Sequence, residues 1–499
     1  MAKDLVLDVD ENPKKISAWL LFSIQHILAM LVACITVPLI TGLPIAATLI
    51  AAGIGTIVYI LITKKKSPVF LSSSFAYLAP MSSALAVGLI NNAGGRNYLA
   101  LILGMFMVGI IYAIVALVIK FVGTAWLNKL LPPIIVGPVI MVIGLSLAGS
   151  AVSNITSASG SGDSYNLLAL LCGLVALFLT ALSSHYGKGK MLSLIPFVVG
   201  MGGGYILAVL ITLFGYTIGH NDYCNIVNFE PLVKIFRDFN FSSIINYKLF
   251  LPNDSESFIF LRFDEISKFD WVTIGEVALL FIPVAFVTIC EHIGDHENLG
   301  QIINRDLLNG EPGMQRTLLG DGLATAISGC ICGAANTTYG ENVAVIGTTK
   351  IASVRVVLLA AILTICFGFI TPFTALLSTI PSCVTGGVSL ILYGFIASSG
   401  VKMLIKEKID FSISKNIFVA SVILVAGIGG LQFQFFPQVV NGVTTYSITI
   451  TSVAVAMILG ILVNLVLKDD DKKEVESNEE LIEEEKNIFA YELEHLAKS

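Results

Sequence analysis

The chain has 499 residues, of which 55% are hydrophobic and only 13% charged, and its formal net charge is −6. Its mean hydropathy is +0.86. Soluble globular domains carry about a quarter of their residues as Asp, Glu, Lys and Arg. The composition therefore excludes a soluble globule and predicts an all-α membrane protein that crosses the bilayer many times.

Apolar runs long enough to cross about 30 Å of hydrocarbon recur along most of the chain. We predict about fourteen spans, an even number that puts both termini on one side. The first span is preceded by acidic and basic residues and lacks a cleavage-like small-residue site, so we expect no removable signal peptide. The predicted spans are 17–40, 44–62, 68–90, 97–121, 130–151, 165–184, 191–215, 271–298, 317–333, 337–354, 355–378, 385–400, 416–432 and 445–468.

The short loops on the side of the termini hold nearly all the loop Lys and Arg residues, whereas the opposite short loops hold only Arg96. Cytoplasmic loops carry such an excess, so we expect a multi-pass protein of the cell membrane with both termini in the cytoplasm. The basic residues on the side of the termini are Lys64, Lys65, Lys66, Lys120, Lys129, Lys188, Lys190, Arg305, Arg316, Lys350, Arg355, Lys402, Lys406, Lys408 and Lys415.

Two polar stretches separate from the spans. Residues 216–270 form an outward loop that is long enough for a small ordered cap. Residues 469–499 form a cytoplasmic tail dense in Asp, Glu and Lys, which we interpret as a solvated helix or a disordered segment without a role in transport.

Two segments depart from a simple transmembrane helix. Residues 68–80, in the third span, mix Ser, aromatic and β-branched residues between two prolines, and residues 333–340 lead into the tenth span. Irregular backbone is tolerated at membrane depth only where it is buried or lines a cavity. We expect both segments to be short extended stretches that feed half-helices and direct N–H groups at one ligand. Positions three and ten of fourteen are equivalent in two halves of about seven spans, which predicts an inverted repeat.

Acidic residues also occur within apolar surroundings. Glu291, His292, Asp295, His296 and Glu297 lie within one short stretch of the eighth span, and Glu341 lies in the tenth. Carboxylates at membrane depth are costly and usually face a protein interior or a water-filled cavity. They predict a path for an ion or a substrate.

Five motifs follow one another along the apolar spans, namely Gln25-His26, Ser73-Ser74-Phe75-Ala76, Glu291-His292-Ile293-Gly294, Asp321-Gly322 and Asn336-Thr337-Thr338-Tyr339-Gly340-Glu341-Asn342. Together they resemble the nucleobase–ascorbate transporter family, and most closely its bacterial uracil permease branch. The resemblance covers residues 16–468 with the motifs in the family's order.

The resemblance implies a core domain, residues 16–121 and 271–378, and a gate domain, residues 122–215 and 379–468. It further implies proton-coupled import of uracil by an elevator-like movement of the core, in a homodimer formed through the gate domains. The expected partners are uracil, protons and the lipid bilayer, with no nucleic acid, cofactor or metal. The acidic residues at membrane depth all fall in the implied core spans, whereas the gate spans keep their charges in loops.

Uracil is a flat neutral ring with two N–H donors and two carbonyl acceptors. The carboxylates of Glu291 and Glu341 are candidate acceptors for the N–H groups. By resemblance, the main-chain N–H groups of Phe75 and Gly340 meet the carbonyls, and the rings of Phe75 and Tyr339 lie beside the base. Purine transporters of the family typically have Gln in place of Glu341. A purely structural alternative is that Glu341 caps the half-helix of the tenth span.

Glu291 is the candidate proton carrier, because burial favours the protonated form of a carboxyl group. The alternative is a buried acid paired with a neighbouring helix. Asp295 lies one turn after Glu291, where we expect the two acids to share a proton. Asp295 could instead cap backbone groups or pair with a Lys or Arg near the cytoplasmic end.

Three further residues are expected to support the site. Asp321 is interpreted as a helix-connecting or hydrogen-bonding residue that supports Glu291, rather than as a direct ligand. His26 is interpreted as a hydrogen-bond donor between spans, and Asn342 as a residue that orders the tenth segment. Two positions depart from the family pattern. Ala344 replaces a usual Gly, and Asp295 replaces the His of a well-known branch of uracil permeases.

Two alternative functions remain open. The first is a purine or broader nucleobase transporter of the same family, which Glu341 disfavours. The second is a metal-dependent membrane enzyme that uses His292 and His296, four residues apart on one helix face. Ile293 occupies the place of the catalytic Glu in the His-Glu-x-x-His pattern, which argues against this enzyme. The sequence also lacks a Gly-rich phosphate loop followed by Lys and Ser or Thr, so ATP-driven pumping is not expected.

Overall fold

A computed structural model describes residues 5–86, 97–158, 165–187, 195–218, 222–237, 240–251, 258, 271–440 and 443–467. These residues form a mostly helical bundle. Eight of their helices are long and apolar enough to cross a membrane. The chain is therefore a polytopic membrane protein, and the count of about fourteen spans stays a prediction. The predicted tail at 469–499 lies outside the described residues, as do Arg96, Lys188 and Lys190.

The elements follow each other in two series. The first consists of α1 Ile16–Thr41, α2 Ile45–Ile62, β1 Ser72–Ser73, α3 Leu78–Ala86, α4 Tyr98–Val122, α5 Ala125–Leu130, α6 Pro133–Ser146, α7 Ala148–Ile155, α8 Leu167–Tyr186 and α9 Pro196–Thr217. The second consists of α11 Trp271–Ile303, α12 Met314–Cys330, β2 Asn336–Thr337, α13 Gly340–Thr349, α14 Val354–Phe369, α15 Thr371–Ser378, α16 Ser382–Lys406, α17 Ser414–Ile428, β3 Phe433–Val440, β4 Val443–Ile450 and α18 Ser452–Val466.

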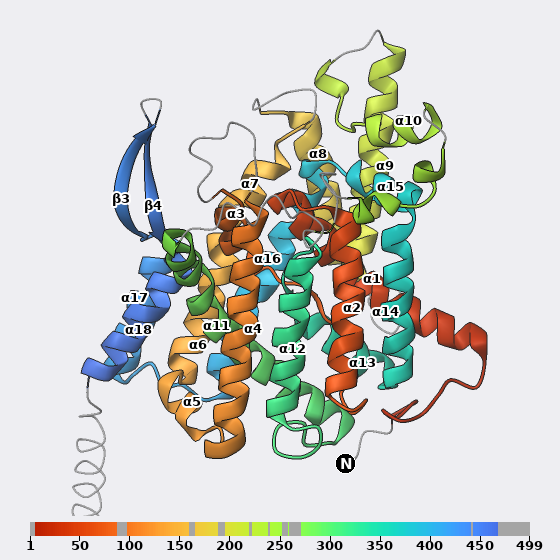
Figure 1. Cartoon of the computed structure of the whole chain (residues 1–499). Coiled ribbons are helices and arrows are strands. Elements are labelled where there is room, and N and C mark those ends of the chain that lie inside the picture. Colours follow the sequence, from red (N-terminus) through yellow and green to blue (C-terminus); the bar gives the residue numbers. More distant parts are fainter. Residues whose placement is uncertain are drawn as a thin grey trace, which may run out of the picture.

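The two series begin alike, with two helices, a two-residue strand, a half-helix and another helix. Strand β1 pairs antiparallel with β2, Ser72 opposite Thr337 and Ser73 opposite Asn336. Because the strands run in opposite directions, α3 and α13 leave the pair toward opposite ends of the bundle (Figure 1). This is the arrangement expected of an inverted repeat.

The helices pack in two groups. In one group α12 contacts α2 and α4, α14 contacts α2, and α11 contacts α4. In the other group α16 contacts α6, α7 and α8, α8 contacts α9, and α17 contacts α6 and α18. Small residues allow close approach of helices in a membrane. At Gly387 of α16, for example, an added Cβ would lie 2.1 Å from the carbonyl oxygen of Gly173 in α8.

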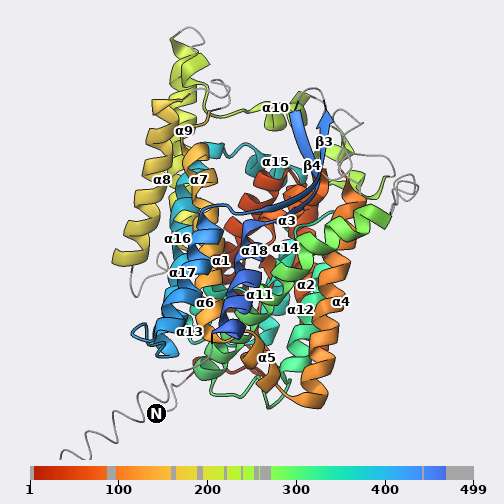
Figure 2. The ribbon, with the colours of Figure 1, turned by 90° about the vertical axis from the view of Figure 1, so that its left-hand side faces the viewer.

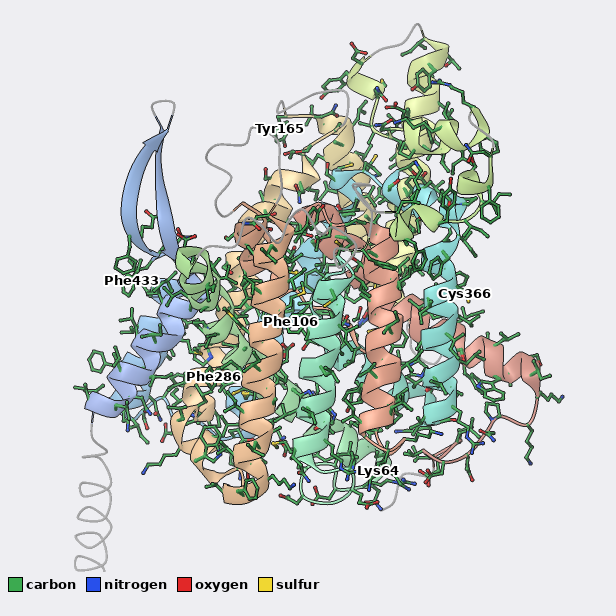
Figure 3. The ribbon with its side chains drawn as sticks, viewed as in Figure 1. Lys64, Phe106, Tyr165, Phe286, Cys366 and Phe433 are labelled. Carbon is green, nitrogen blue, oxygen red and sulfur yellow. The ribbon has the colours of Figure 1, made fainter. Side chains whose placement is uncertain are left out.

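One end of the bundle carries the N-terminal segment, and we call it the N-terminal face. Leu7 pairs with Ile351, which follows α13. Arg305, just beyond the end of α11, forms ion pairs with Asp8 at 2.8 Å and Asp10 at 3.3 Å. The ends of α11 and α13 therefore lie on this face, as does Lys64 at the end of α2 (Figure 3).

The opposite end carries the cap predicted within residues 216–270. Its described parts contain the 3₁₀ turns Asp222–Cys224, Phe241–Ser243 and Tyr247–Phe250 and the short helix α10 Glu230–Arg237. Asn246 fastens the cap to the junction between α14 and α15. Its main-chain N–H donates to the carbonyl of Phe369, and its Nδ2 donates to the carbonyl of Gly368, both at 2.9 Å.

The structure corrects three boundaries. Residues 443–450 form strand β4, paired with β3, rather than the start of the last span, which is helical only over 452–466. The eleventh predicted span ends at Phe369, and α15 follows as a separate helix. Helix α16 continues to Lys406, so Lys402 and Lys406 belong to a helix and not to a loop. Figure 2 shows the β3–β4 hairpin at the same end as α10.

The flank of the bundle is apolar, as a surface in contact with lipid should be. Phe106 and Ile110 of α4 are among its exposed large side chains. Figure 3 shows Phe106 and Phe286 midway along the bundle, far from Lys64 at the N-terminal face. The polar site described below lies inside.

Candidate functional site

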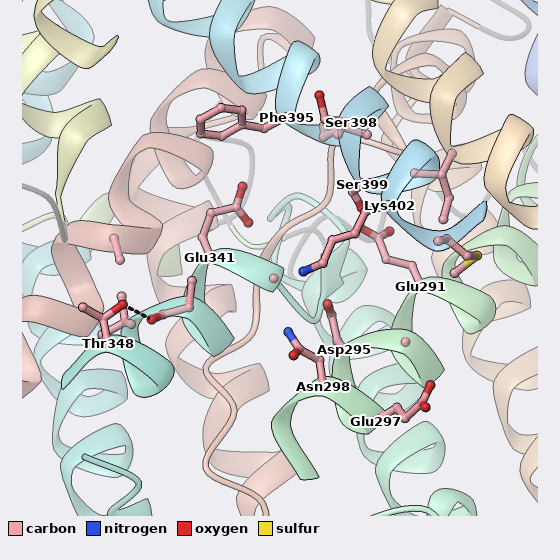
Figure 4. A pocket seen from close by; sticks show the side chains of 18 of the residues that line it. Glu291, Asp295, Glu297, Asn298, Glu341, Thr348, Phe395, Ser398, Ser399 and Lys402 are labelled. Atoms are coloured by element: carbon pink, nitrogen blue, oxygen red, sulfur yellow. Dashed lines mark hydrogen bonds between the residues drawn. The ribbon is translucent and has the colours of Figure 1, made fainter. Parts of the chain in front are cut away.

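A cavity of about 820 Å³ lies between α11 and α13 on one side and α16 on the other. Glu291 and Asp295 of α11, Gly340 and Glu341 of α13, and Lys402 of α16 line it (Figure 4). Small-molecule sites typically measure about 300–1,000 Å³. The volume suits a small polar ligand together with water.

We call Glu291, Asp295 and Glu341 the acid cluster. Residues four apart on a helix share a face, which brings Glu291 and Asp295 to the same side of α11. Glu341 reaches the cavity from α13. The strand pair positions α13, and it therefore also sets the distance between Glu341 and α11. The sequence predicted each of these side chains, and the structure brings all of them to one cavity (Figure 4).

Glu291 has a free carboxylate. Within the described part of the chain, its side chain makes neither a hydrogen bond nor an ion pair. The alternative interpretation, in which Glu291 is a buried acid paired with a neighbouring helix, therefore lacks a partner for Glu291 among these residues. An unpaired carboxylate on a cavity wall is available to accept a hydrogen bond from a ligand or to bind a proton.

Asp295 is held by the segment that leads into α13. Its Oδ2 accepts a hydrogen bond from the Thr338 hydroxyl at 2.9 Å. A Cβ on Gly340 would lie 3.5 Å from its Oδ1, so the Gly340 backbone passes close to this carboxylate. Asp295 thus connects α11 to the start of α13, a contact that the sequence alone did not predict.

Gly340 and Glu341 begin α13, and Tyr339 occupies the N-cap position without a side-chain cap. The first N–H groups of a helix have no partner within it. They are available to a carbonyl oxygen at the cavity wall. The positive end of the helix dipole also favours the carboxylate of Glu341, so the structural interpretation of Glu341 is compatible with binding.

Phe75 and Tyr339 do not line the cavity but lie behind it, at 4% and 8% exposure. Their ring centroids are 6.4 Å apart, and Phe75 also makes an edge contact with Tyr393 of α16 at 5.7 Å. The Tyr339 hydroxyl donates to the carbonyl of Ser73. The main-chain N–H of Phe75 makes no hydrogen bond within the described residues. Both rings therefore brace the strand pair, and their contact with a base stays a prediction.

His26 and Asn342 form a buried pair. The His26 Nδ1 and the Asn342 Oδ1 are 2.7 Å apart, which joins α1 to α13 directly behind Glu341. This hydrogen bond between spans is the kind expected of His26, and it fixes the orientation of α13 as expected of Asn342.

Asp321 connects two helices, as its helix-connecting interpretation expected, through His292. Its Oδ2 lies 2.8 Å from the Nδ1 of His292, and both side chains are fully buried away from the cavity. The hydrogen bond of Asp321 is therefore made to His292, the residue next to Glu291 in the sequence, and not to Glu291 itself. It stabilises α11 against α12.

The proposed metal ligands of the alternative enzyme are engaged elsewhere. His296 lies within hydrogen-bond distance of the Tyr59 hydroxyl, and its ring stacks on His292 with 4.0 Å between centroids. Among the described residues, no group of three or more His, Cys, Asp and Glu side chains could hold a metal ion. The geometry therefore gives the enzyme hypothesis no support.

The cavity residues of α16 that the sequence missed include Phe395 and Lys402. Figure 4 shows the Phe395 ring on the side of Glu341 and the Lys402 ammonium between the two helices that carry the acids. The sequence could have placed both residues in a helix, because apolar and Gly residues continue with helical periodicity to Met403.

The sequence pattern of the Permease family matches residues 17–436. The chain belongs to the nucleobase–ascorbate transporter family. This confirms the resemblance seen in the motifs. The relatives include the uracil permease of Bacillus caldolyticus, 40% identical over 93% of this chain and 94% of that protein. The uracil permease of Bacillus subtilis strain 168 is 38% identical over 96% of this chain and 99% of that protein.

The uracil permease of Escherichia coli K12 is 31% identical over 93% of this chain and 94% of that protein. Among solved structures, the transmembrane domain of the cyanobacterial bicarbonate transporter BicA matches with a TM-score of 0.57 and 14% identity, over 92% of this chain and 98% of that one. Murine Slc26a9, an anion transporter, matches with a TM-score of 0.57 and 10% identity, over 91% and 69%. These solved structures are similar to this chain in fold, whereas the uracil permeases are similar to it in sequence.

Proposed function

We propose that this protein is a proton-coupled symporter that imports uracil across the cell membrane. The observation that carries the proposal is the acid cluster, which places three carboxylates on one cavity inside a membrane bundle. Its sequence relatives include uracil permeases, and the match extends over nearly their whole length. Import of uracil is the function that this chemistry and this kinship support together.

The cavity offers the groups that a uracil ring requires. Carboxylates of the acid cluster accept from the two ring N–H groups, and the free N–H groups at the start of α13 donate to a ring carbonyl. Phe75 and Tyr339 support the wall on which the ring lies. In this proposal Glu291 also carries the proton, because its carboxylate has no competing partner within the described residues.

An elevator-like movement agrees with the packing of the helices. The acid cluster belongs to α11 and α13, which join the group of α2, α4, α12 and α14. The opposite wall belongs to α16, which joins the group of α6, α7 and α8. We propose that the first group is the moving core, residues 16–121 and 271–378. The second is the gate, residues 122–215 and 379–468, through which two copies associate.

The orientation follows from the same geometry. The cavity reaches the surface near Glu297 and Lys406, whose side chains are 41% and 43% exposed. Glu297 lies toward the end of α11, and hence toward the N-terminal face. We propose that this face is cytoplasmic and that the structure represents an inward-facing state.

The proposal is tested by uptake of labelled uracil in cells that lack their own uracil transport, at two external pH values and with unlabelled competitors. We expect uptake to be faster at the lower pH, to be inhibited by unlabelled uracil and to be resistant to xanthine. Equal inhibition by xanthine would favour the purine or broad nucleobase transporter. Absence of uracil uptake in cells that display the protein at the surface would reject the proposal.

Replacement of Asp295 with Asn is expected to shift the pH profile of uracil uptake toward acid. A negative charge on Asp295 favours protonation of the neighbouring Glu291. When Asn removes that charge, a more acidic medium is needed to protonate Glu291. The profile is measured as initial uptake against external pH after correction for expression. Thr338→Val is the control for the hydrogen bond, since it removes the donor to Asp295 but leaves the carboxyl group in place. A profile of Asp295→Asn that superimposes on wild type would show that Asp295 has a structural role only.

A further inference from the structure

Helix α16 brings two lysines to the cavity. Lys402 and Lys406 are four residues apart and so lie on one face of the helix. Lys406 forms an ion pair with Glu297 of α11 at 2.8 Å, at the mouth of the cavity. Lys402 lies one turn deeper, and Figure 4 shows its ammonium directed at the space enclosed by the acid cluster.

The two walls of the cavity carry opposite charges. The charged side chains on the walls from α11 and α13 are all carboxylates, namely the acid cluster and Glu297. The wall from α16 carries Lys402 and Lys406, with Glu407 at the outer end of the helix. Since Lys406 is already paired with Glu297, Lys402 is the cation on this wall that remains for the acid cluster.

Lys402 faces the acid cluster without binding it directly. Within the described part of the chain, no ion pair of 4.0 Å or less joins it to a carboxylate. Water or a small ligand therefore fits between the ammonium and the acids. Lys402 is exposed on the cavity wall, so water partly screens its attraction to the acids, and this attraction acts on the carboxylates only when they are ionised.

We infer that Lys402 is a positioning residue for proton release, a fixed counter-charge on α16 that stabilises the ionised acid cluster when the cavity opens to the N-terminal face. The inference rests on the proposed proton–uracil symport and adds to it the step at which the proton leaves. The O–H bond of the carboxyl group breaks and the proton passes to water in the cavity, while the electron pair stays on the carboxylate.

The position of Lys402 on α16 links this effect to the movement of the core. If the acid cluster moves past α16 toward the opposite face, it leaves Lys402 behind, and the pair between Glu297 of the core and Lys406 of α16 must break. There the acids lack the counter-charge and take up a proton more readily. The same carboxylates would thus bind protons on one side of the membrane and release them on the other.

The test uses Lys402→Gln in right-side-out membrane vesicles, whose internal pH is set during preparation. Two processes are measured with labelled uracil. Net uptake driven by an inwardly directed proton gradient requires proton release inside, whereas counterflow against unlabelled uracil needs no release. Lys408→Gln is the control, since Lys408 is exposed beyond the end of α16 and does not line the cavity.

We expect Lys402→Gln to keep counterflow and to lose net uptake at neutral internal pH. Net uptake should recover at an internal pH about one unit more alkaline, which corresponds to a tenfold change in proton affinity. Lys402→Arg should restore the wild-type profile, and Lys408→Gln should not alter it. Size-exclusion profiles of the purified variants check that they fold.

Two results would overturn the inference. The first is net uptake by Lys402→Gln that follows internal pH as wild type does. The second is an equal loss of counterflow and net uptake, which would make Lys402 a uracil ligand or a structural residue. Failure of the proposed function itself is distinguishable, because the wild-type protein would then show no uracil counterflow or no response to the proton gradient.

Discussion

Replacement of Glu341 with Gln is expected to reduce uracil uptake at subsaturating concentration by roughly tenfold or more. A carboxylate only accepts hydrogen bonds, whereas the amide of Gln presents donors that would face a ring N–H. An unmatched polar pair in a buried site costs about 1–3 kcal/mol. The measurement is initial uptake of labelled uracil, normalised to the amount of protein at the cell surface.

Glu230→Gln is the matched control for this loss. It removes the same charge from α10 in the cap, where Glu230 pairs with Lys234 on the exposed surface. Glu341→Gln should also weaken the preference for uracil over xanthine. If Glu341→Gln takes up uracil within about twofold of wild type, Glu341 is not a ligand of the base.

Replacement of Glu291 with Gln is expected to abolish accumulation of uracil while preserving its binding. Gln resembles the protonated acid, so the variant can load substrate but cannot release a proton at the N-terminal face. Binding is measured with labelled uracil on purified protein, and accumulation in vesicles with an imposed pH gradient. Counterflow should persist, because it requires no change of protonation.

The same Glu230→Gln variant controls for the loss of a charge. Normal accumulation by Glu291→Gln in response to a pH gradient would assign the coupled proton to another group. Loss of binding along with accumulation would instead make the ionised carboxylate of Glu291 essential for holding the base.

The sequence predicted the parts of the fold in which composition changes sharply. The extended stretches within 68–80 and 333–340 were recognisable because Ser, Thr, Pro and Gly interrupt an apolar helix at membrane depth. The acid cluster was recognisable because carboxylates rarely occur there. These signals are local, so each could be read from a short window of residues.

The β3–β4 hairpin was missed because hydropathy measures apolar content and not its period. Polar and apolar residues alternate over 445–450 in the way of a strand, and the pair Asn441-Gly442 is typical of a hairpin turn. The end of α16 was missed for a related reason. Lys402 was assigned to a loop by its charge, although its spacing from the preceding residues continues the helix.

Contacts between distant segments could not be predicted from one sequence. Asp321 was expected to support Glu291, but the side of α11 that meets α12 carries His292 instead. Likewise, nothing in the sequence indicates that Thr338 bonds to Asp295 or that Lys402 enters the cavity from α16. Such contacts depend on the rotation and packing of whole helices.

The central claim is that uracil and protons cross the membrane together. It is tested most directly with purified protein in proteoliposomes that contain a pH-sensitive dye, with the membrane potential clamped to zero. Addition of uracil is predicted to acidify the interior in proportion to the uracil taken up, and the Glu291→Gln variant should give no acidification. Entry of labelled uracil into wild-type proteoliposomes without any change of internal pH would contradict proton–uracil symport.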